Sequence, residues 1–221
     1  MPEPTGCKIG GLIVAGGMGT RMGGREKPLL HLGDVPIVEL ILRRVRPQVD
    51  AIAIDVRPSS RNRYERWRVQ GIPILSDPYC GAIGPLGGIA AGLTWLPTIG
   101  DAFEWLATVP GDAPFLPRDL VARLKSLALP GNARPVVAVD RERIQNLCAL
   151  WPARCLPRLN QGIQTGRWRS VGRALEDFDA IHCPIDAGDH SFTNINTEGD
   201  LAQAELLVHR RARTSNANEP R

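Results

Sequence analysis

Short apolar runs alternate with amphipathic stretches along the chain. The apolar runs predict buried strands over residues 9–15, 51–56, 72–75, 105–109, 135–140, 147–151 and 180–184. Apolar positions at helical spacing, or small residues flanked by glycine, predict helices over residues 36–46, 61–70, 87–96, 117–127, 171–177 and 197–209. This alternation predicts an α/β fold with a mostly parallel sheet and helices on both faces.

Three features refine this prediction. The runs 135–140 and 147–151 are close enough in sequence to form an antiparallel pair. Pro117 is expected at the start of its helix, where a missing N–H costs little. Thr197 and Asp200 have the spacing of a capping box at the start of the last helix.

The length of 221 residues fits one domain. We place it at residues 9–209, after an N-terminal extension (1–8) and before a polar, disordered tail (210–221). The composition, 43% hydrophobic and 23% charged, is typical of a soluble globular protein. No apolar run is long enough to span a bilayer and residues 1–8 do not resemble a secretory signal, so we expect no membrane association and a cytoplasmic location.

Charge and cysteines narrow the choice of partners. The net charge is +4, but the basic residues do not form a stripe interleaved with aromatic residues, so nucleic acid is not an expected partner. A basic surface suits a small polyanionic substrate. The five cysteines have no Cys-x-x-Cys spacing, and we expect them to be reduced thiols.

A glycine-rich loop follows the first predicted strand. Residues 14–27 have the sequence VAGGMGTRMGGREK. Glycines let backbone N–H groups approach a polyphosphate, and Arg21 and Lys27 add positive charge for the β- and γ-phosphates. The loop has neither the Gly-Lys-Ser/Thr of a Walker A motif nor the Gly-x-Gly-x-x-Gly of a dinucleotide fold. A plain surface turn would need neither this glycine density nor the basic pair.

Two further loops follow predicted strands. Asp112, in the loop Pro-Gly-Asp-Ala-Pro of residues 110–114, either caps the next turn or holds Mg²⁺ against triphosphate oxygens; beside the glycine-rich loop we favour the metal. The third loop combines Asp77 with Gly84-Pro85-Leu86-Gly87-Gly88. Its glycines suit either a base pocket or close packing of a helix on the sheet, and both interpretations stay open. No histidine lies at a ligand spacing, and no Gly-x-Ser-x-Gly motif supports a hydrolase.

Together these segments resemble the molybdenum cofactor guanylyltransferases, a family of nucleotidyltransferases with a Rossmann-like sheet. The first motif matches over residues 14–27, and weaker matches follow in the same order at Asp77 with 84–88, at 110–114, and at 194–197 (Asn-Ile-Asn-Thr). The resemblance extends from about residue 10 to about residue 206.

The resemblance implies transfer of GMP from GTP to the phosphate of the molybdenum-bearing molybdopterin, with release of pyrophosphate. It implies nucleotide contacts at Val14, Ala15, Gly16, Gly17, Lys27, Asp55, Asp77, Gly84, Pro85, Leu86, Gly87 and Asp112. It assigns catalysis to Lys27, Arg21 and Asp112, Mg²⁺ to Asp112, and the pterin side to Asn194 and Asn196. Transient contact with cofactor-insertion proteins or molybdoenzymes is also expected.

Two positions depart from the family pattern. Glu26 stands where the family usually has aspartate, and Asp55 where it often has an asparagine facing the base. A carboxylate at 55 still accepts hydrogen bonds from guanine N1–H and N2–H₂. The alternatives are a cytidylyltransferase acting on the same pterin, another small-molecule nucleotidyltransferase, and a non-catalytic nucleotide-binding adaptor. Gly16-Gly17 and Met22-Gly23 favour guanine over cytosine, and retention of both Lys27 and Asp112 favours an enzyme.

Overall fold

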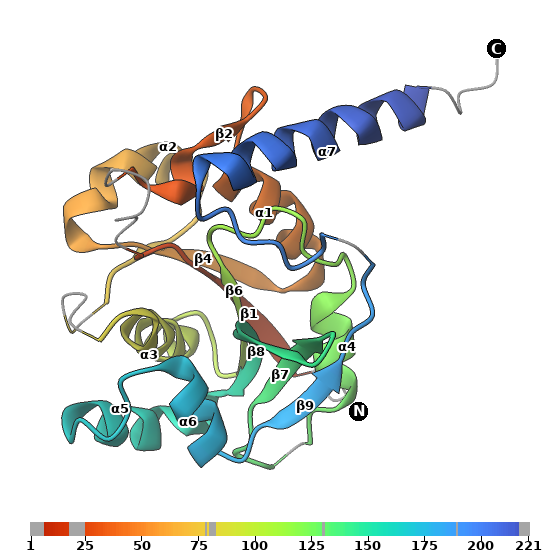
Figure 1. The fold of residues 1–221 in the computed structure, drawn as a ribbon. Coiled ribbons are helices and arrows are strands. Elements are labelled where there is room, and N and C mark those ends of the chain that lie inside the picture. The colour runs from red at the N-terminus through yellow and green to blue at the C-terminus, as the bar shows by residue number, and fades with distance from the viewer. Residues whose placement is uncertain are drawn as a thin grey trace, which may run out of the picture.

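The central element is a seven-stranded sheet in the order β5-β4-β1-β6-β8-β7-β9 (Figure 1). The computed structural model describes residues 7–17, 25–77, 79, 83–129, 131–188 and 190–216. The strands are β1 (Lys8–Val14), β4 (Ala51–Asp55), β5 (Ile74–Leu75), β6 (Phe103–Pro110), β7 (Val136–Asp140), β8 (Arg143–Pro152) and β9 (Ile181–Pro184). β8 runs antiparallel to β6 and β7, and the other neighbours are parallel. The mostly parallel sheet and the antiparallel β7–β8 pair were predicted, whereas the antiparallel β6–β8 pair was not.

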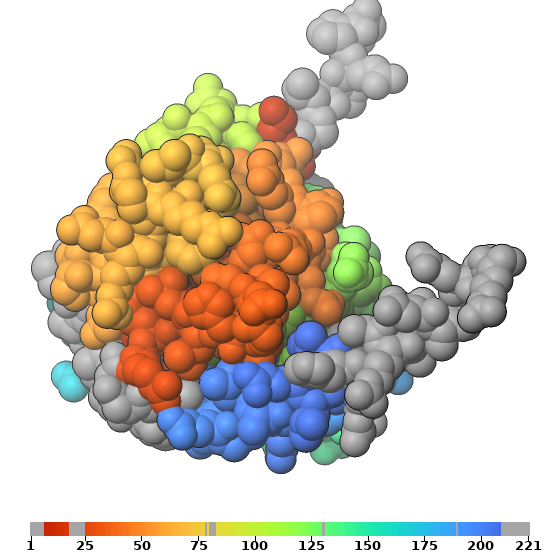
Figure 2. All heavy atoms as spheres, turned by 90° about the horizontal axis from the view of Figure 1, so that it is seen from above, coloured from red at the N-terminus to blue at the C-terminus, as the bar shows by residue number. Residues whose placement is uncertain are grey.

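Helices cover both faces of the sheet, each over its own apolar core. On one face lie α1 (Ile37–Val45), α2 (Glu65–Val69), α4 (Leu120–Ser126) and α7 (Glu198–Asn216). On the other lie α3 (Pro85–Trp95), α5 (Leu156–Gln164) and α6 (Val171–Asp177). A small hairpin of β2 (His31–Leu32) and β3 (Val35–Pro36) precedes α1. Figure 2 shows α7, in blue, lying beside this early segment, in orange-red.

Short 3₁₀ helices complete the described chain. They are η2 (Lys27–Leu29), η3 (Arg46–Gln48), η4 (Pro58–Tyr64), η5 (Leu96–Thr98) and η6 (Ala153–Cys155). The polar helix predicted over 61–70 is therefore divided between η4 and α2. No helix in the described part of the chain is long and apolar enough to cross a membrane.

The parallel strands end together at one edge of the sheet. Val14 is in register with Asp55 on one side and with Pro110 on the other, and Asp55 is in register with Leu75. The loops that follow these strands therefore start side by side, where ligands bind in open parallel sheets. The segment after β9 returns to the same edge, because the N–H of Ile195 donates to the Asp112 carbonyl at 2.8 Å.

The predicted start of one helix is wrong. α4 begins at Leu120, three residues after Pro117, so the proline does not occupy the first turn of the helix. The cause is Gln48, whose Oε1 accepts from the Val121 N–H at 2.9 Å and whose Nε2 donates to the Pro117 carbonyl at 3.2 Å. A side chain from a distant segment thus fixes the first turn of α4.

The predicted capping box at α7 is confirmed. The Asp200 N–H donates to Thr197 Oγ1 at 3.1 Å, and the Thr197 N–H donates to Asp200 Oδ2 at 2.8 Å. α7 continues to Asn216, so the segment predicted as a tail from residue 210 is helical up to that point. Its alanines, leucines and arginines favour helix. α5 and the β2–β3 hairpin were not predicted.

Candidate active site

A cavity of about 240 Å³ lies at the carboxyl ends of the parallel strands. We refer to it as the strand-end cavity, and it is lined by Val14, Ala15, Gly17, Lys27, Pro28, Pro85, Pro110, Gly111, Asp112 and Leu147. The three loops singled out from the sequence therefore contribute to one site.

Backbone hydrogen bonds join the ends of three neighbouring strands, β4, β1 and β6, at the strand-end cavity. The Gly111 N–H donates to the Val14 carbonyl at 2.9 Å, and the Ala15 N–H donates to the Asp55 carbonyl at 2.8 Å. A Cβ atom on Gly111 would lie 3.0 Å from the Val14 oxygen and 3.1 Å from Cβ of Ala15. Glycine at 111 thus lets the loops after β1 and β6 touch.

Lys27 joins two other predicted residues. Its Nζ lies 3.1 Å from Oδ2 of Asp112 and donates to Oδ1 of Asn196 at 2.5 Å. The Lys27 and Asp112 side chains are only 17% and 22% exposed, so their attraction is less screened than at an open surface. The structure brings together three residues from distant parts of the sequence, each assigned to the site beforehand.

The capping box of α7 holds Asn196 in this position. Oδ2 of Asp200 accepts from the backbone N–H of Asn196 at 2.9 Å as well as from Thr197. These hydrogen bonds, the one from Asn196 first, hold the pKa of Asp200 below its ordinary value. The start of α7 is thereby connected to the Lys27 ammonium.

Glu26 does not line the strand-end cavity and instead contacts η4. It is buried, and its Oε1 accepts from Ser60 Oγ at 2.6 Å and lies 3.3 Å from Nη1 of Arg63. Because Glu26 immediately precedes Lys27, these contacts attach the lysine segment to η4. Sequence reasoning noted Glu26 only as a departure from a family pattern, because its partners lie more than thirty residues away.

Asp55 and Asp77 lie against the first turn of α3. Their side chains are nearly buried, with residue exposures of 3% and 8%, and neither is among the described residues that line the strand-end cavity. A Cβ on Gly88 would fall 2.2 Å from Oδ2 of Asp55, and one on Gly87 would fall 2.1 Å from Cγ of Asp77. Close packing, one of the two interpretations of these glycines, is confirmed, and contact with a base stays a prediction.

Burial changes the protonation of Asp55. It raises the pKa of Asp55 from 3.8 to about 7, and the nearby charge of Asp77 adds to the effect. Oδ1 of Asp55 is buried and accepts no hydrogen bond from the described residues. The end of β4 therefore carries an acceptor to which no described residue donates.

The remaining predicted site residues lie in different places. Pro85 lines the strand-end cavity, whereas Leu86 is fully buried in the core beneath α3. Gly84, at the N-cap of α3, has a φ of +59°, a conformation that glycine adopts readily. Gly16 packs beside Asp55, where a Cβ would lie 3.3 Å from Oδ2. Arg21 lies outside the described residues.

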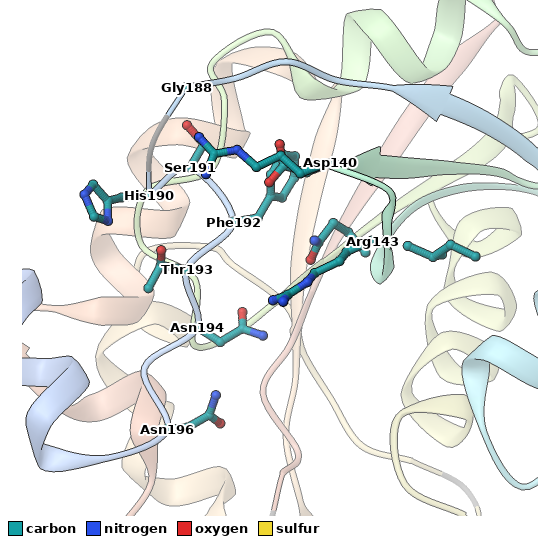
Figure 3. Close-up of a pocket in the computed structure, with 12 residues that line it drawn as sticks. Asp140, Arg143, Gly188, His190, Ser191, Phe192, Thr193, Asn194 and Asn196 are labelled. Carbon is teal, nitrogen blue, oxygen red and sulfur yellow. The ribbon is translucent and has the colours of Figure 1, made fainter.

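A second cavity, of about 760 Å³, lies beside the β7–β8 turn. We refer to it as the hairpin cavity; its lining includes Asp140, Arg141, Arg143, His190, Asn194 and Asn196 (Figure 3). Both predicted pterin-side asparagines thus belong to one cavity. Because Asn196 also contacts Lys27, the hairpin cavity and the strand-end cavity meet at these two side chains.

The residues present fit a magnesium ion that is bound together with a nucleotide. In the described part of the chain, no three histidine, cysteine or acidic side chains gather as a metal site. Mg²⁺ commonly uses one or two protein carboxylates and takes its other ligands from phosphates and water. Asp112, in the strand-end cavity, could be that carboxylate.

Comparisons with known proteins agree with this geometry. Residues 11–178 match the family model described as MobA-like NTP transferase domain. The chain is 38% identical over 208 residues to a molybdenum cofactor guanylyltransferase from Cereibacter sphaeroides, covering 93% of this chain and 100% of the relative. It is 33% identical over 204 residues to a protein of the same name from Rhodopseudomonas palustris (strain BisB5), covering 91% and 95%.

Solved structures share the fold. The molybdopterin-guanine dinucleotide biosynthesis protein A from Archaeoglobus fulgidus superimposes with a TM-score of 0.70 at 21% sequence identity, covering 91% of this chain and 99% of that one. The predicted α/β architecture is therefore confirmed both by the sheet itself and by its structural relatives.

Proposed function

The chain belongs to the MobA-like NTP transferase family, and we propose that it transfers GMP from GTP to the phosphate of molybdenum-bearing molybdopterin. The observation that carries the proposal is the position of Lys27. Its ammonium lies between Asp112, on the side of the glycine-rich loop, and Asn196, on the side of the hairpin cavity. Curated relatives named for this reaction align over nearly the whole chain.

The proposed reaction is an in-line displacement at the α-phosphorus of GTP. An oxygen of the acceptor phosphate forms the new P–O bond, the bond to the β-phosphate oxygen breaks, and the electron pair leaves with pyrophosphate. A phosphate monoester is ionised near neutral pH and needs no general base. The site accordingly needs positive charge and alignment more than proton transfer.

Lys27 and Arg21 would neutralise the triphosphate. In the structure the Lys27 ammonium is within 3.1 Å of Asp112, so binding a nucleotide would give this ammonium a second anionic partner. Mg²⁺ held by Asp112 and phosphate oxygens would add charge neutralisation as pyrophosphate departs. The backbone at Val14, Ala15, Gly16 and Gly17 would hold the phosphates.

Asp55, Asp77 and the 84–87 segment are our proposed base-side residues. The Asp55 oxygen that accepts from none of the described residues supports a base with N–H groups on its edge, and guanine has them at N1 and N2. The two acidic side chains lie at the ends of adjacent strands, one strand beyond the glycine-rich loop. Contact with cofactor-insertion proteins or molybdoenzymes, and a cytoplasmic location, complete the proposal.

The test is pyrophosphate release with molybdopterin, Mg²⁺ and each of GTP, CTP, ATP and UTP in turn. We expect release with GTP that requires molybdopterin, and we expect GTP with Mg²⁺ to raise the thermal midpoint most among the four, because a ligand selective for the native state stabilises it. A clear preference for CTP in both assays would replace guanine by cytosine. Nucleotide binding without pyrophosphate release would indicate an adaptor.

A further inference from the structure

The β7–β8 turn places an arginine at the edge of the hairpin cavity. Asp140 and Arg143 pair across the turn, and the two residues between them have positive φ angles, 46° for Arg141 and 65° for Glu142. Two-residue hairpin turns of this form usually contain asparagine and glycine. Side chains in this conformation cost roughly 1–2 kcal/mol each. The turn therefore fixes the start of β8 at Arg143 in spite of a backbone cost.

The Arg143 side chain projects across the hairpin cavity. In Figure 3 the guanidinium of Arg143 and the amide of Asn194 point toward each other from β8 and from the segment after β9. Arg143 is exposed, and no carboxylate of the described residues forms a salt bridge with it. A forked cation and an amide thus face the same space.

The hairpin cavity contains a cation without a counter-ion among the described residues. This cation is Arg143, and Asp140 is the one carboxylate in the described lining, with no salt bridge to it. By contrast, the Lys27 cation at the junction of the two cavities already faces Asp112. An anion that enters the hairpin cavity would find its positive charge at the β7–β8 turn.

The position and the volume of the hairpin cavity suit the second substrate of a transfer reaction. The volume of about 760 Å³ is within the usual range for small-molecule sites. Asn194 is two residues from Asn196, whose amide oxygen accepts from Lys27 in the neighbouring cavity. A group held between Arg143 and Asn194 would therefore lie on the side from which an acceptor can approach a nucleotide at Lys27.

We propose that Arg143, with Asn194 opposite it across the hairpin cavity, binds the phosphate monoester of the acceptor. The guanidinium presents paired N–H donors that match phosphate oxygens, which a point charge does not. It also offsets the repulsion between an acceptor dianion and a triphosphate. The proposal rests on the proposed function, and it adds a binding residue that sequence reasoning missed.

The test compares Arg143→Gln, Arg143→Lys and Arg118→Gln with the wild type. Arg118 is exposed, lies just before α4 and lines neither cavity, so it controls for loss of one positive charge. For Arg143→Gln we expect the KM for molybdopterin to rise roughly ten- to a hundredfold, the range for losing a hydrogen bond to a charged group. The KM of Arg143→Lys for molybdopterin should lie between those of Arg143→Gln and the wild type, and that of Arg118→Gln should be unchanged. The KM for GTP and the GTP-induced thermal shift should be unchanged in all three variants.

A second measurement separates this proposal from the function. Binding of molybdopterin alone, followed by pterin fluorescence without nucleotide, should be weakened by Arg143→Gln to the same degree. Transfer with an unaltered molybdopterin KM in Arg143→Gln would overturn the role of Arg143 and leave the function standing. Arg143-dependent binding without any guanylyl transfer would overturn the function and leave the role of Arg143. If wild type neither binds nor uses molybdopterin, both are wrong.

Discussion

At Lys27, one ammonium serves two segments that are eighty-four residues apart in the sequence. It contacts Asp112 after β6 and Asn196 before α7. Both hydrogen bonds have a charged donor, which makes them stronger than hydrogen bonds between neutral groups. Removing the cation leaves Asp112 without its counter-charge and Asn196 without its donor. The residue therefore affects the ground state of the site as well as the bound triphosphate.

We expect Lys27→Ala and Asp112→Ala each to lower kcat/KM for guanylyl transfer by about two orders of magnitude or more. This is the usual cost of losing one preorganised group that stabilises charge in the transition state. Pyrophosphate release at several GTP concentrations measures it, with the exposed Lys8→Ala as the control for loss of a lysine. Near-normal activity in folded Asp112→Ala would contradict the metal assignment.

Asp55 makes stability depend on pH. The native state keeps its proton up to a pH near 7, whereas an unfolded chain releases it near the ordinary pKa of 3.8. Between these values the native state binds more protons, so the free energy of unfolding falls as pH rises through this window. Asp55→Asn, which cannot ionise, should raise the thermal midpoint by roughly 5 °C at about pH 8 and by less than roughly 2 °C at about pH 5. An equal shift at both pH values would show that the charge is not the cause.

At the scale of an element, the first turn of α3 depends on two adjacent glycines. Gly88 faces Asp55 and Gly87 faces Asp77, and a methyl group at either position would overlap a buried carboxyl group. The helix can pack this closely on β4 and β5 only because these positions lack side chains. The same packing holds the two carboxyl groups in place.

Gly88→Ala should destabilise the protein by about 1–3 kcal/mol, the usual cost of overpacking a filled interior. Thermal unfolding measures the change, at roughly 2–4 °C per kcal/mol for a chain of this size. The matched control is Gly17→Ala, since a Cβ there meets no heavy atom of the described residues within 4 Å. Equal midpoints for the two variants would mean that α3 can shift away from the sheet without cost.

The local sequence could predict some element boundaries and not others. The capping box of α7 was predictable because Thr197 and Asp200 lie within one turn of each other. The start of α4 was not, because Gln48 supplies its cap from more than seventy residues away. α5 was missed because Gly162 interrupts its helical pattern, although a Cβ on Gly162 would overlap the ring of Trp168. The residue that disguises α5 is thus part of its packing.

At the scale of the whole molecule, the reactivity of the cysteines reports how well the helices cover the sheet. Four described cysteines are free thiols, as predicted, and Cys148, Cys155 and Cys183 are buried. Burial raises the pKa of Cys148 and Cys183, and it raises that of Cys155 to about 12. Burial limits the access of reagents to these three thiols, and the raised pKa lowers the fraction of thiolate, which is the form that reacts with electrophiles.

We expect Cys7, which is only half-buried, to react with a maleimide or a disulfide reagent at least roughly tenfold faster than these three in the native protein. Peptide mass spectrometry of partly labelled samples gives the order. All four should react at similar rates in guanidinium chloride, which is the control for intrinsic reactivity. Rapid native labelling of Cys148 or Cys155 would show that one face of the sheet opens.

The architecture and much of the candidate site follow from the sequence for one physical reason. Because parallel strands end at a common edge, the loops that follow separate apolar runs lie close together. Lys27 accordingly contacts both Asp112 and Asn196. Glu26 and Arg143 were missed because their roles depend on where distant segments return. Contacts of Glu26 with η4, and the direction of Arg143 across the hairpin cavity, have no local sequence pattern.

The contact between Lys27 and Asn196 also bears on the order in which the protein is made. The described lining of the strand-end cavity is complete at Leu147, whereas the asparagines of the hairpin cavity come after β9. Synthesis from the N-terminus therefore supplies the nucleotide side first and the acceptor side only near its end. A growing chain on the ribosome has the parts to hold a nucleotide before it has the parts to use one.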